Sequence, residues 1–312
     1  MLKKIMFLSV CCVGNAAWSQ GIWVDNQHEK ASQNITQWAN KLDNWFGEPN
    51  PDDPASATLR VMVDTHWHQH DGVKVKPRVR GNVRLPTLKE KVSVVFGDET
   101  LDNEILDSSR DAHHWVYRDA KKFNQKQSRD ENSSLALRWG NLNRHWGVQT
   151  DADVGVRSGS DVYLRLKAKK DVYQNQDLTT QVSQIYRYGV KSKHFARSSI
   201  EIQKQQSPNV LIANHTHADY VHHKGEKGWS WGNSTYRQHH FSGSRRLNYG
   251  IQASGAIGGS KHQFNSYGIF ASWRQPVWRN WLFAQTEVQY ANNRDEKRKH
   301  YPSGMLRLEA IF

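Results

Sequence analysis

A period of two governs this chain from residue 57 to its last residue, Phe312. In segment 73–85, apolar residues, proline and glycine hold the odd positions, whereas lysine, arginine and asparagine hold the even ones. Successive side chains of a β-strand point to opposite faces, so the pattern predicts strands with one apolar and one strongly charged face. It does not fit a parallel sheet that is buried on both faces.

We count fourteen such segments, most of them about ten residues long, which is the length that a tilted strand needs to cross a bilayer. Their boundaries are soft, so twelve or sixteen strands also fit the pattern. The predicted strands cover residues 57–68, 73–85, 91–97, 134–140, 147–157, 161–170, 179–190, 194–204, 209–219, 229–241, 246–258, 262–274, 280–291 and 303–312.

A secreted soluble β-sandwich would also alternate, so further features must distinguish it from a membrane barrel. The last segment ends in Phe312, with Leu306 and Leu308 on one face, and is similar to the C-terminal signal read by the machinery that assembles outer-membrane barrels. Tryptophans such as Trp139 and Trp146 flank predicted turns, where an interfacial aromatic girdle belongs. The sequence therefore predicts an all-β fold, a transmembrane antiparallel up-and-down β-barrel.

The lengths of the connections point the same way. If the first strand runs outward, the long connections 98–133, 219–228 and 292–302 all lie outside the cell, as in bacterial outer-membrane barrels. Pro77 conflicts with this pattern, because a closed barrel offers no free edge for proline, and a β-bulge is expected there. The short connections expected at the periplasmic end are 86–90, 141–144, 205–208, 242–245 and 275–279.

Residues 1–19 read as a secretory signal peptide, with Lys3 and Lys4 before a short apolar stretch. Cleavage after residue 19 would remove both cysteines and leave the mature chain without a disulfide or a thiolate. Residues 20–56 are expected to be periplasmic, with an amphipathic helix over 25–46, capped by Asp25, and a proline-rich linker before the barrel of residues 57–312. The apolar stripe of that helix must dock on the barrel mouth, a membrane surface or a partner.

Several stretches resemble a family of uncharacterised proteobacterial outer-membrane β-barrel proteins. The resemblance extends over the mature chain and implies a barrel in the outer membrane, with no catalytic residues to carry over. The stretches are Asp43 to Gly47, Arg78 to Leu88, Val94 to Asp98, Leu101 to Glu104, Val277 to Phe283 and Leu306 to Glu309.

The chain holds 43 Lys and Arg against 30 Asp and Glu, a net charge of +13, or +11 without Lys3 and Lys4. Much of this excess falls on the polar faces of the predicted strands, and a positive lumen favours anions. The leading hypothesis is thus a narrow, anion-leaning pore or small-solute channel, and the alternative is an interior filled by neutralising Arg–carboxylate ladders. The predicted lining residues are Arg60, Lys74, Lys76, Arg78, Arg80, Arg84, Arg165, Lys167, Asp64, Asp151, Asp153, Glu287, Arg307 and Glu309.

Histidines recur at the expected outer strand tips, where an i, i+2 pair places two imidazoles on one strand face. His66 with His68, and His215 with His217, are therefore candidate metal ligands, although neutral histidine also suits a wet loop. His240 and Ser242 have the His-x-Ser spacing of outer-membrane phospholipases, so an outer-membrane hydrolase or lipid-modifying enzyme is a second hypothesis, against a simple polar turn. A structural or adhesion barrel with functional outer loops is the third.

The sequence predicts no cofactor and a bacterial outer-membrane location. The expected partners are outer-membrane lipid and lipopolysaccharide, small anionic solutes, and the barrel assembly machinery through Phe312. Nucleic acid is excluded as a partner, because the basic residues form strand faces rather than a recognition helix.

Overall fold

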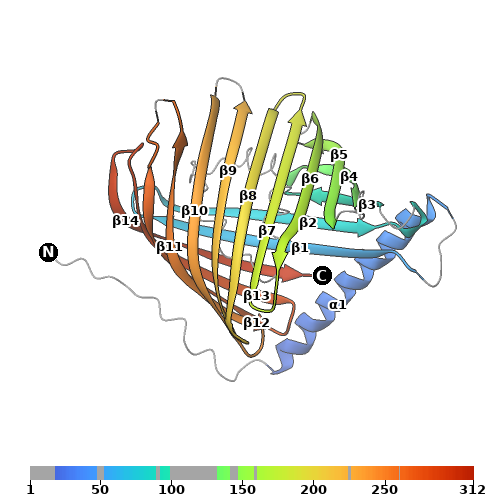
Figure 1. Cartoon of the computed structure of the whole chain (residues 1–312). Helices are drawn as coiled ribbons and strands as arrows, with labels where there is room; N and C mark the ends of the chain where they lie inside the picture. The colour runs from blue at the N-terminus through green and yellow to red at the C-terminus, as the bar shows by residue number, and fades with distance from the viewer. Residues whose placement is uncertain are drawn as a thin grey trace.

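Each alternating segment forms one strand of a closed antiparallel barrel, in a computed structural model of the chain (Figure 1). The structure describes residues 18–47, 53–88, 92–98, 132–140, 147–157, 160–223, 226–259 and 261–312. The predicted signal peptide therefore lies almost wholly outside the described residues, as does the predicted long loop 98–133. Fourteen strands are present among the described residues, in agreement with the sequence prediction.

Neighbouring strands in the chain are neighbours in the barrel, so the topology is up-and-down. A short 3-10 turn, η1 (Pro86–Leu88), follows the second strand. The strands are β1 (Ser56–His68), β2 (Gly72–Arg84), β3 (Val92–Gly97), β4 (Leu135–Gly140), β5 (Val148–Arg157), β6 (Asp161–Gln174), β7 (Leu178–Gly189), β8 (Lys193–Ser207), β9 (Val210–His223), β10 (Glu226–Phe241), β11 (Arg245–Ile257), β12 (Ser266–Trp278), β13 (Leu282–Asn293) and β14 (Arg298–Ile311).

The first and last strands close the barrel. β1 pairs with β14 in register from Arg60 opposite Ile311 to His68 opposite Ser303. Beyond the ladder, the backbone amides of Leu59 and Phe312 each donate to the carbonyl of the other, at 3.0 and 2.8 Å. The even number of strands brings the start of β1 and the end of β14 to the same end of the barrel, which we name the terminal end.

Two of the long outer connections predicted from the sequence are instead mostly strand. β9 continues to His223 and β10 begins at Glu226, so the predicted loop 219–228 is a tight connection. The predicted loop 292–302 reduces to the turn between Asn293 and Arg298. The residues at these strand tips are charged and polar on both faces, because a strand that extends beyond the bilayer needs no apolar face. The alternation that predicts strands is therefore absent there.

No bulge accompanies Pro77, so that expectation is wrong. Pro77 pairs in regular register with Val63 of β1. The N and C=O of one strand residue point to the same side, and the Pro77 carbonyl accepts a hydrogen bond from the Asn132 side chain at 2.9 Å. β3 pairs only with residues 80–84 of β2, so no β2–β3 ladder hydrogen bond requires an N–H at residue 77.

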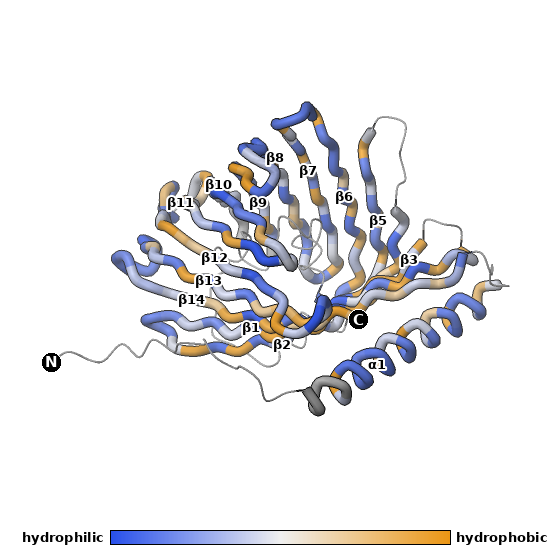
Figure 2. Tube along the Cα trace, turned by 90° about the horizontal axis from the view of Figure 1, so that it is seen from below, coloured by the Kyte–Doolittle hydropathy of each residue, from blue (hydrophilic) through white to orange (hydrophobic). Residues whose placement is uncertain are grey.

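The barrel is inside out relative to a soluble protein. Asp64, Arg78 and Glu309 are 0% exposed, whereas Ile251 and Val288 are about 60% exposed. Hydrophobic and hydrophilic residues alternate along the strands in Figure 2. The apolar faces therefore form the outer wall and the charged faces point inward, which is the arrangement of a barrel whose outer surface meets lipid.

The helix lies against the outer wall and not in the lumen (Figures 1 and 2). α1 (Trp18–Asn44) begins before the predicted first residue, because nothing upstream of Asp25 interrupts it, and Asp25 is not a cap. The Asp25 carboxylate instead accepts hydrogen bonds from Trp278 Nε1 at 2.8 Å and Arg279 Nε at 3.1 Å. The Trp278 hydrogen bond holds the pKa of Asp25 below its ordinary value. No helix within the described residues is long and apolar enough to span a bilayer.

An ion pair joins the turn between β1 and β2 to the start of β14 across the seam, at the end of the barrel opposite the terminal end. Asp71, between β1 and β2, accepts two hydrogen bonds of 3.1 Å from the Arg298 guanidinium of β14. These hydrogen bonds hold the pKa of Asp71 below its ordinary value of 3.8. Their stabilisation is therefore present above about pH 4 and is lost as the pH falls through the lowered pKa.

We expect Asp71→Asn to lower the free energy of unfolding by about 0.5 to 1 kcal/mol at neutral pH, the upper range for an accessible ion pair. The difference from the wild type should disappear near pH 2. Urea titrations of the folded barrel at both pH values measure it. Asp177→Asn is the control, because the Asp177 side chain has no ion-pair partner among the described residues. Equal losses of stability for the two variants would contradict a stabilising role of the Asp71–Arg298 ion pair.

Candidate lumen and its charged network

The fourteen predicted lining residues all lie on strands, on the face opposite the exposed apolar side chains. The lining residues of one strand are an even number of positions apart, since residues two apart on a strand share a face. Most of them are buried or half-buried. Three carboxylates organise the charged part of this face, and each of them bridges two arginines from different strands.

The first of these groups is centred on Asp64 of β1, which is 0% exposed. Arg307 of β14 donates from Nε and Nη2 to its two oxygens, at 2.6 and 3.0 Å. Arg78 of β2 approaches Asp64 from the other side at 3.4 Å and donates from Nε to Asp98 at 2.7 Å. The closure of the barrel between β1 and β14 therefore creates this group, because Asp64 and Arg307 are 243 residues apart in the chain.

The second group is centred on Glu309 of β14, which is also 0% exposed. Arg60 of β1 donates from Nε to Glu309 Oε1 at 2.6 Å. Arg274 of β12 donates to the other oxygen, Oε2. The Arg274 guanidinium also lies 4.2 Å from the ring centroid of Phe283, at cation–π distance.

The third group lies on a separate part of the wall and is centred on Asp153 of β5. Arg138 of β4 binds it through two hydrogen bonds, from Nε at 2.8 Å and from Nη2 at 3.0 Å. Arg165 of β6 lies 2.6 Å from the same carboxylate. Bidentate arginine–carboxylate geometry is the strongest form of this contact.

Each bridging carboxylate is thus shared by two guanidinium groups. Arg78 also pairs with Asp98, so the first group is balanced in charge, whereas the second and third groups each hold two arginines and one carboxylate. Arginine–carboxylate pairs therefore bridge neighbouring strands on the inner face, with six arginines to four carboxylates in the three groups. Other basic residues share this inner face: Lys76 is half-buried, and Lys167 and Arg80 are buried. Arg84 donates to Asp53, ahead of β1.

Between the charged groups, the inner face of β11 to β13 carries neutral polar side chains that bond to one another. Asn248 donates to Ser272 at 3.3 Å, and Gln252 donates to Gln289 at 3.0 Å. Glu287 is buried here, and its Oε2 has no hydrogen-bond partner in the described part of the chain. The charge of the interior is therefore unevenly distributed, with the arginine groups on β1, β2, β4 to β6, β12 and β14.

The remaining predicted acid, Asp151, is half-buried on the inner face of β5. It forms no ion pair with another described residue. The predicted assembly residue, Phe312, lies at the seam, where its ring stacks on His28 of α1 with centroids 4.8 Å apart.

The histidine candidates are partly brought together. The rings of His215 and His217 share the inner face of β9, with centroids 5.4 Å apart. His68 contacts His70 and Tyr301, whereas His66 is two residues further into β1. No group of three His, Cys, Asp or Glu residues suited to a metal ion occurs in the described ranges.

The structure does not assemble a catalytic group around His240 and Ser242. His240 is on β10, where its Nε2 lies 2.6 Å from Gln238 Nε2. Ser242 lies in the exposed turn after β10. Neither His240 nor Ser242 forms a hydrogen bond or ion pair with a carboxylate among the described residues.

The sequence reasoning missed three members of the network. Arg274 and Asp219 are the last residues of predicted strands, and Asp98 directly follows the predicted strand 91–97. In the structure they bind Glu309, Arg197 and Arg78, respectively. The alternation within the predicted strand 262–274 already places Arg274 on the same face as Phe270 and Ser272. Their ion-pair partners could not be found in this way, because pairing across strands depends on register.

Comparison with known proteins identifies the fold and nothing finer. No protein-family model matches the chain, and no curated protein matches it by sequence. Among solved structures, OprB of Pseudomonas putida aligns with a TM-score of 0.50 and 9% identity, over 83% of this chain and 94% of that one. The outer-membrane channel DcaP of Acinetobacter baumannii gives a TM-score of 0.47 and 9% identity, over 85% and 99%. The chain has the fold of outer-membrane β-barrels.

Proposed function

We propose that this chain is an outer-membrane β-barrel that conducts small solutes through a basic, anion-favouring lumen. The inside-out distribution of side chains supports the membrane location, because the wide apolar outer wall would be costly in water. The segments that resemble proteobacterial outer-membrane proteins support the same location. In this proposal the terminal end faces the periplasm, with lipid and lipopolysaccharide as neighbours and Phe312 as the assembly signal.

The excess of arginine over carboxylate in the three buried groups, six against four, is the observation that carries the anion preference. Positive side chains on a wall of low dielectric attract anions and repel cations. Asn82 and Gln149 are exposed although they lie on the inner face. Both lie within two residues of the terminal end of their strands, so their exposure supports a solvent-filled mouth at that end.

We expect the refolded protein to give discrete conductance steps in planar bilayers, with a reversal potential that favours chloride over potassium in a salt gradient. The physical reason is the net positive charge of the lining. Increasing the salt from about 0.1 to 1 M should weaken the preference, because the Debye length falls from about 10 to 3 Å. Single-channel recording measures both effects.

Conductance steps without ion selectivity would contradict the anion preference but not the channel function. An absence of steps from protein that is folded, as judged by resistance to heat and detergent, would contradict the channel itself. Phospholipid hydrolysis by folded protein that gives no conductance steps would instead support the hydrolase hypothesis.

A further inference from the structure

Outside the lumen, the helix α1 presents three differently composed sides. Ile35 and the fully buried Ala39 face the outer wall, where Ala39 packs with Val83 and Leu85. Gln33 and Gln37 are exposed on a polar side. A third side carries tryptophan: Trp23 is 64% exposed, and Trp38 is 48% exposed.

The tryptophans form one stripe. Trp23 and Trp38 are fifteen residues apart, close to four helical turns, and Trp45 follows two turns after Trp38 in the closing turn of the helix. Trp45 is 81% exposed. Exposed tryptophan along one edge of a helix is typical of a helix that lies in the membrane interface.

The opposite edge of α1 holds the helix to the barrel rim. Asp25 and Asp43 are eighteen residues apart, which is five turns, so they share one side. Asp25 binds Trp278 and Arg279 at the corner between β12 and β13. Asp43 accepts a hydrogen bond from the Thr87 amide, in the connection between β2 and β3, at 3.2 Å. Both contacts are with connections at the terminal end.

The tryptophan edge therefore points away from the rim and along the wall. Trp38 meets the ring of Phe96 edge-on, with centroids 6.3 Å apart. Phe96 lies across the backbone of Gly81, where any Cβ would lie within 2.0 Å of the ring. This glycine leaves the ring flat on the outer wall, which continues into the apolar surface of the barrel.

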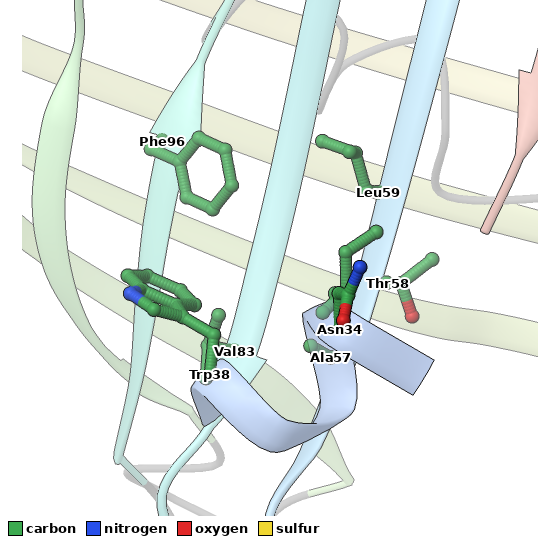
Figure 3. A pocket seen from close by; sticks show the side chains of 8 residues that line it. Asn34, Trp38, Ala57, Thr58, Leu59, Val83 and Phe96 are labelled. Carbon is green, nitrogen blue, oxygen red and sulfur yellow. The ribbon is translucent and has the colours of Figure 1, made fainter. Parts of the chain in front are cut away.

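A partly open cavity of about 190 Å³ lies between the helix and the wall (Figure 3). Ile35 and Trp38 line it from α1, and Leu59, Val83 and Phe96 line it from the strands. Asn34 and Thr58 also line the cavity, but its lining surface is almost entirely apolar. It therefore offers water few of the two to four polar partners that water needs in such a site. A hydrocarbon chain would recover the dispersion contacts that an empty cavity loses.

We propose that α1 and the wall beneath it form a phospholipid site of the periplasmic leaflet, with an acyl chain in the cavity and Trp23, Trp38 and Trp45 at the depth of the headgroups. The proposal rests on the proposed outer-membrane location, because only a membrane continuous with the outer wall reaches this cavity. The charged lumen plays no part in it.

Spin labels on single cysteines test the depth of the helix, in a background without Cys11 and Cys12 (both changed to Ser). Trp23→Cys and Trp45→Cys should be several-fold more accessible to oxygen than to an aqueous nickel chelate, in vesicles of phosphatidylethanolamine and phosphatidylglycerol. Gln33→Cys is the control on the polar side and should show the reverse ratio. Leu308→Cys, on the outer wall, reports whether the barrel itself is in the bilayer.

A lipid signature at Leu308→Cys with an aqueous signature at Trp23→Cys and Trp45→Cys would overturn the phospholipid site and leave the barrel location intact. An aqueous signature at Leu308→Cys would overturn the proposed location instead. Native mass spectrometry tests the cavity. The wild type should retain bound phospholipid, and Leu59→Trp and Ile35→Trp, which fill the cavity from its two walls, should each lose it. Retention by both variants at the level of the control Leu308→Trp would overturn the acyl-chain site.

Discussion

Asp64→Asn should destabilise the folded barrel by about 3 to 5 kcal/mol, the cost of breaking a buried ion pair by removing one partner. The substitution keeps the shape of the side chain and removes its charge. Arg78 and Arg307 would then lie buried beside a neutral amide, and Arg307 would lose its two charge-assisted hydrogen bonds of 2.6 and 3.0 Å. The urea midpoint of the barrel in lipid vesicles measures the loss.

Asp151→Asn is the matched control. Asp151 is also an inward-facing aspartate, but it is half-buried and forms no ion pair with the described residues. Its substitution should therefore change the free energy of unfolding by less than about 1 kcal/mol. Similar losses for both variants would show that the Asp64 group does not hold the seam.

A second substitution separates charge imbalance from lost packing. Asp64→Asn combined with Arg307→Gln removes one buried cation together with the carboxylate. If uncompensated charge dominates the loss, the double variant should be more stable than the sum of the two single effects by about 1 to 3 kcal/mol. Strict additivity would assign the loss to packing.

The strands were predictable because alternation is a local property. The alternation within Val73 to Leu85 assigns each side chain to the outer wall or to the interior, and this assignment does not depend on the other strands. The predicted range 73–85 and the observed β2 (Gly72–Arg84) differ by one residue at each end. The tips of β9 and β10 were not predicted as strand because residues beyond the bilayer do not alternate between apolar and polar.

The network and the position of the helix depend on contacts that the sequence does not record. Asp64 was correctly placed on a charged face, but its bond with Arg307 requires the register of the closing strands. Asp25 was interpreted as a helix cap because aspartate before an apolar stripe is a frequent signal. Its observed partners, Trp278 and Arg279, lie more than 250 residues away, where no local pattern could indicate them.

The burial and ion pairing of each lysine and arginine decide whether it should control selectivity. Arg78 is 0% exposed and is held by Asp64 and Asp98, so Arg78→Glu should impair folding before it alters the pore. Lys76 and Lys169 are half-buried on the inner face and therefore lie nearer to any permeating ion. The charge that matters for permeation is the charge that solvent can reach.

We expect Lys76→Glu combined with Lys169→Glu to shift the permeability ratio of chloride to potassium toward potassium by roughly tenfold, equivalent to about 1.4 kcal/mol of change in the difference between the barriers for the two ions. The isosteric control, Lys76→Met with Lys169→Met, removes the charge without reversing it and should give an intermediate ratio. Reversal potentials in a salt gradient measure all three proteins. If both double variants keep the wild-type ratio while remaining folded and conducting, these lysines lie off the ion path, and the buried arginine groups would have to supply the selectivity through the wall.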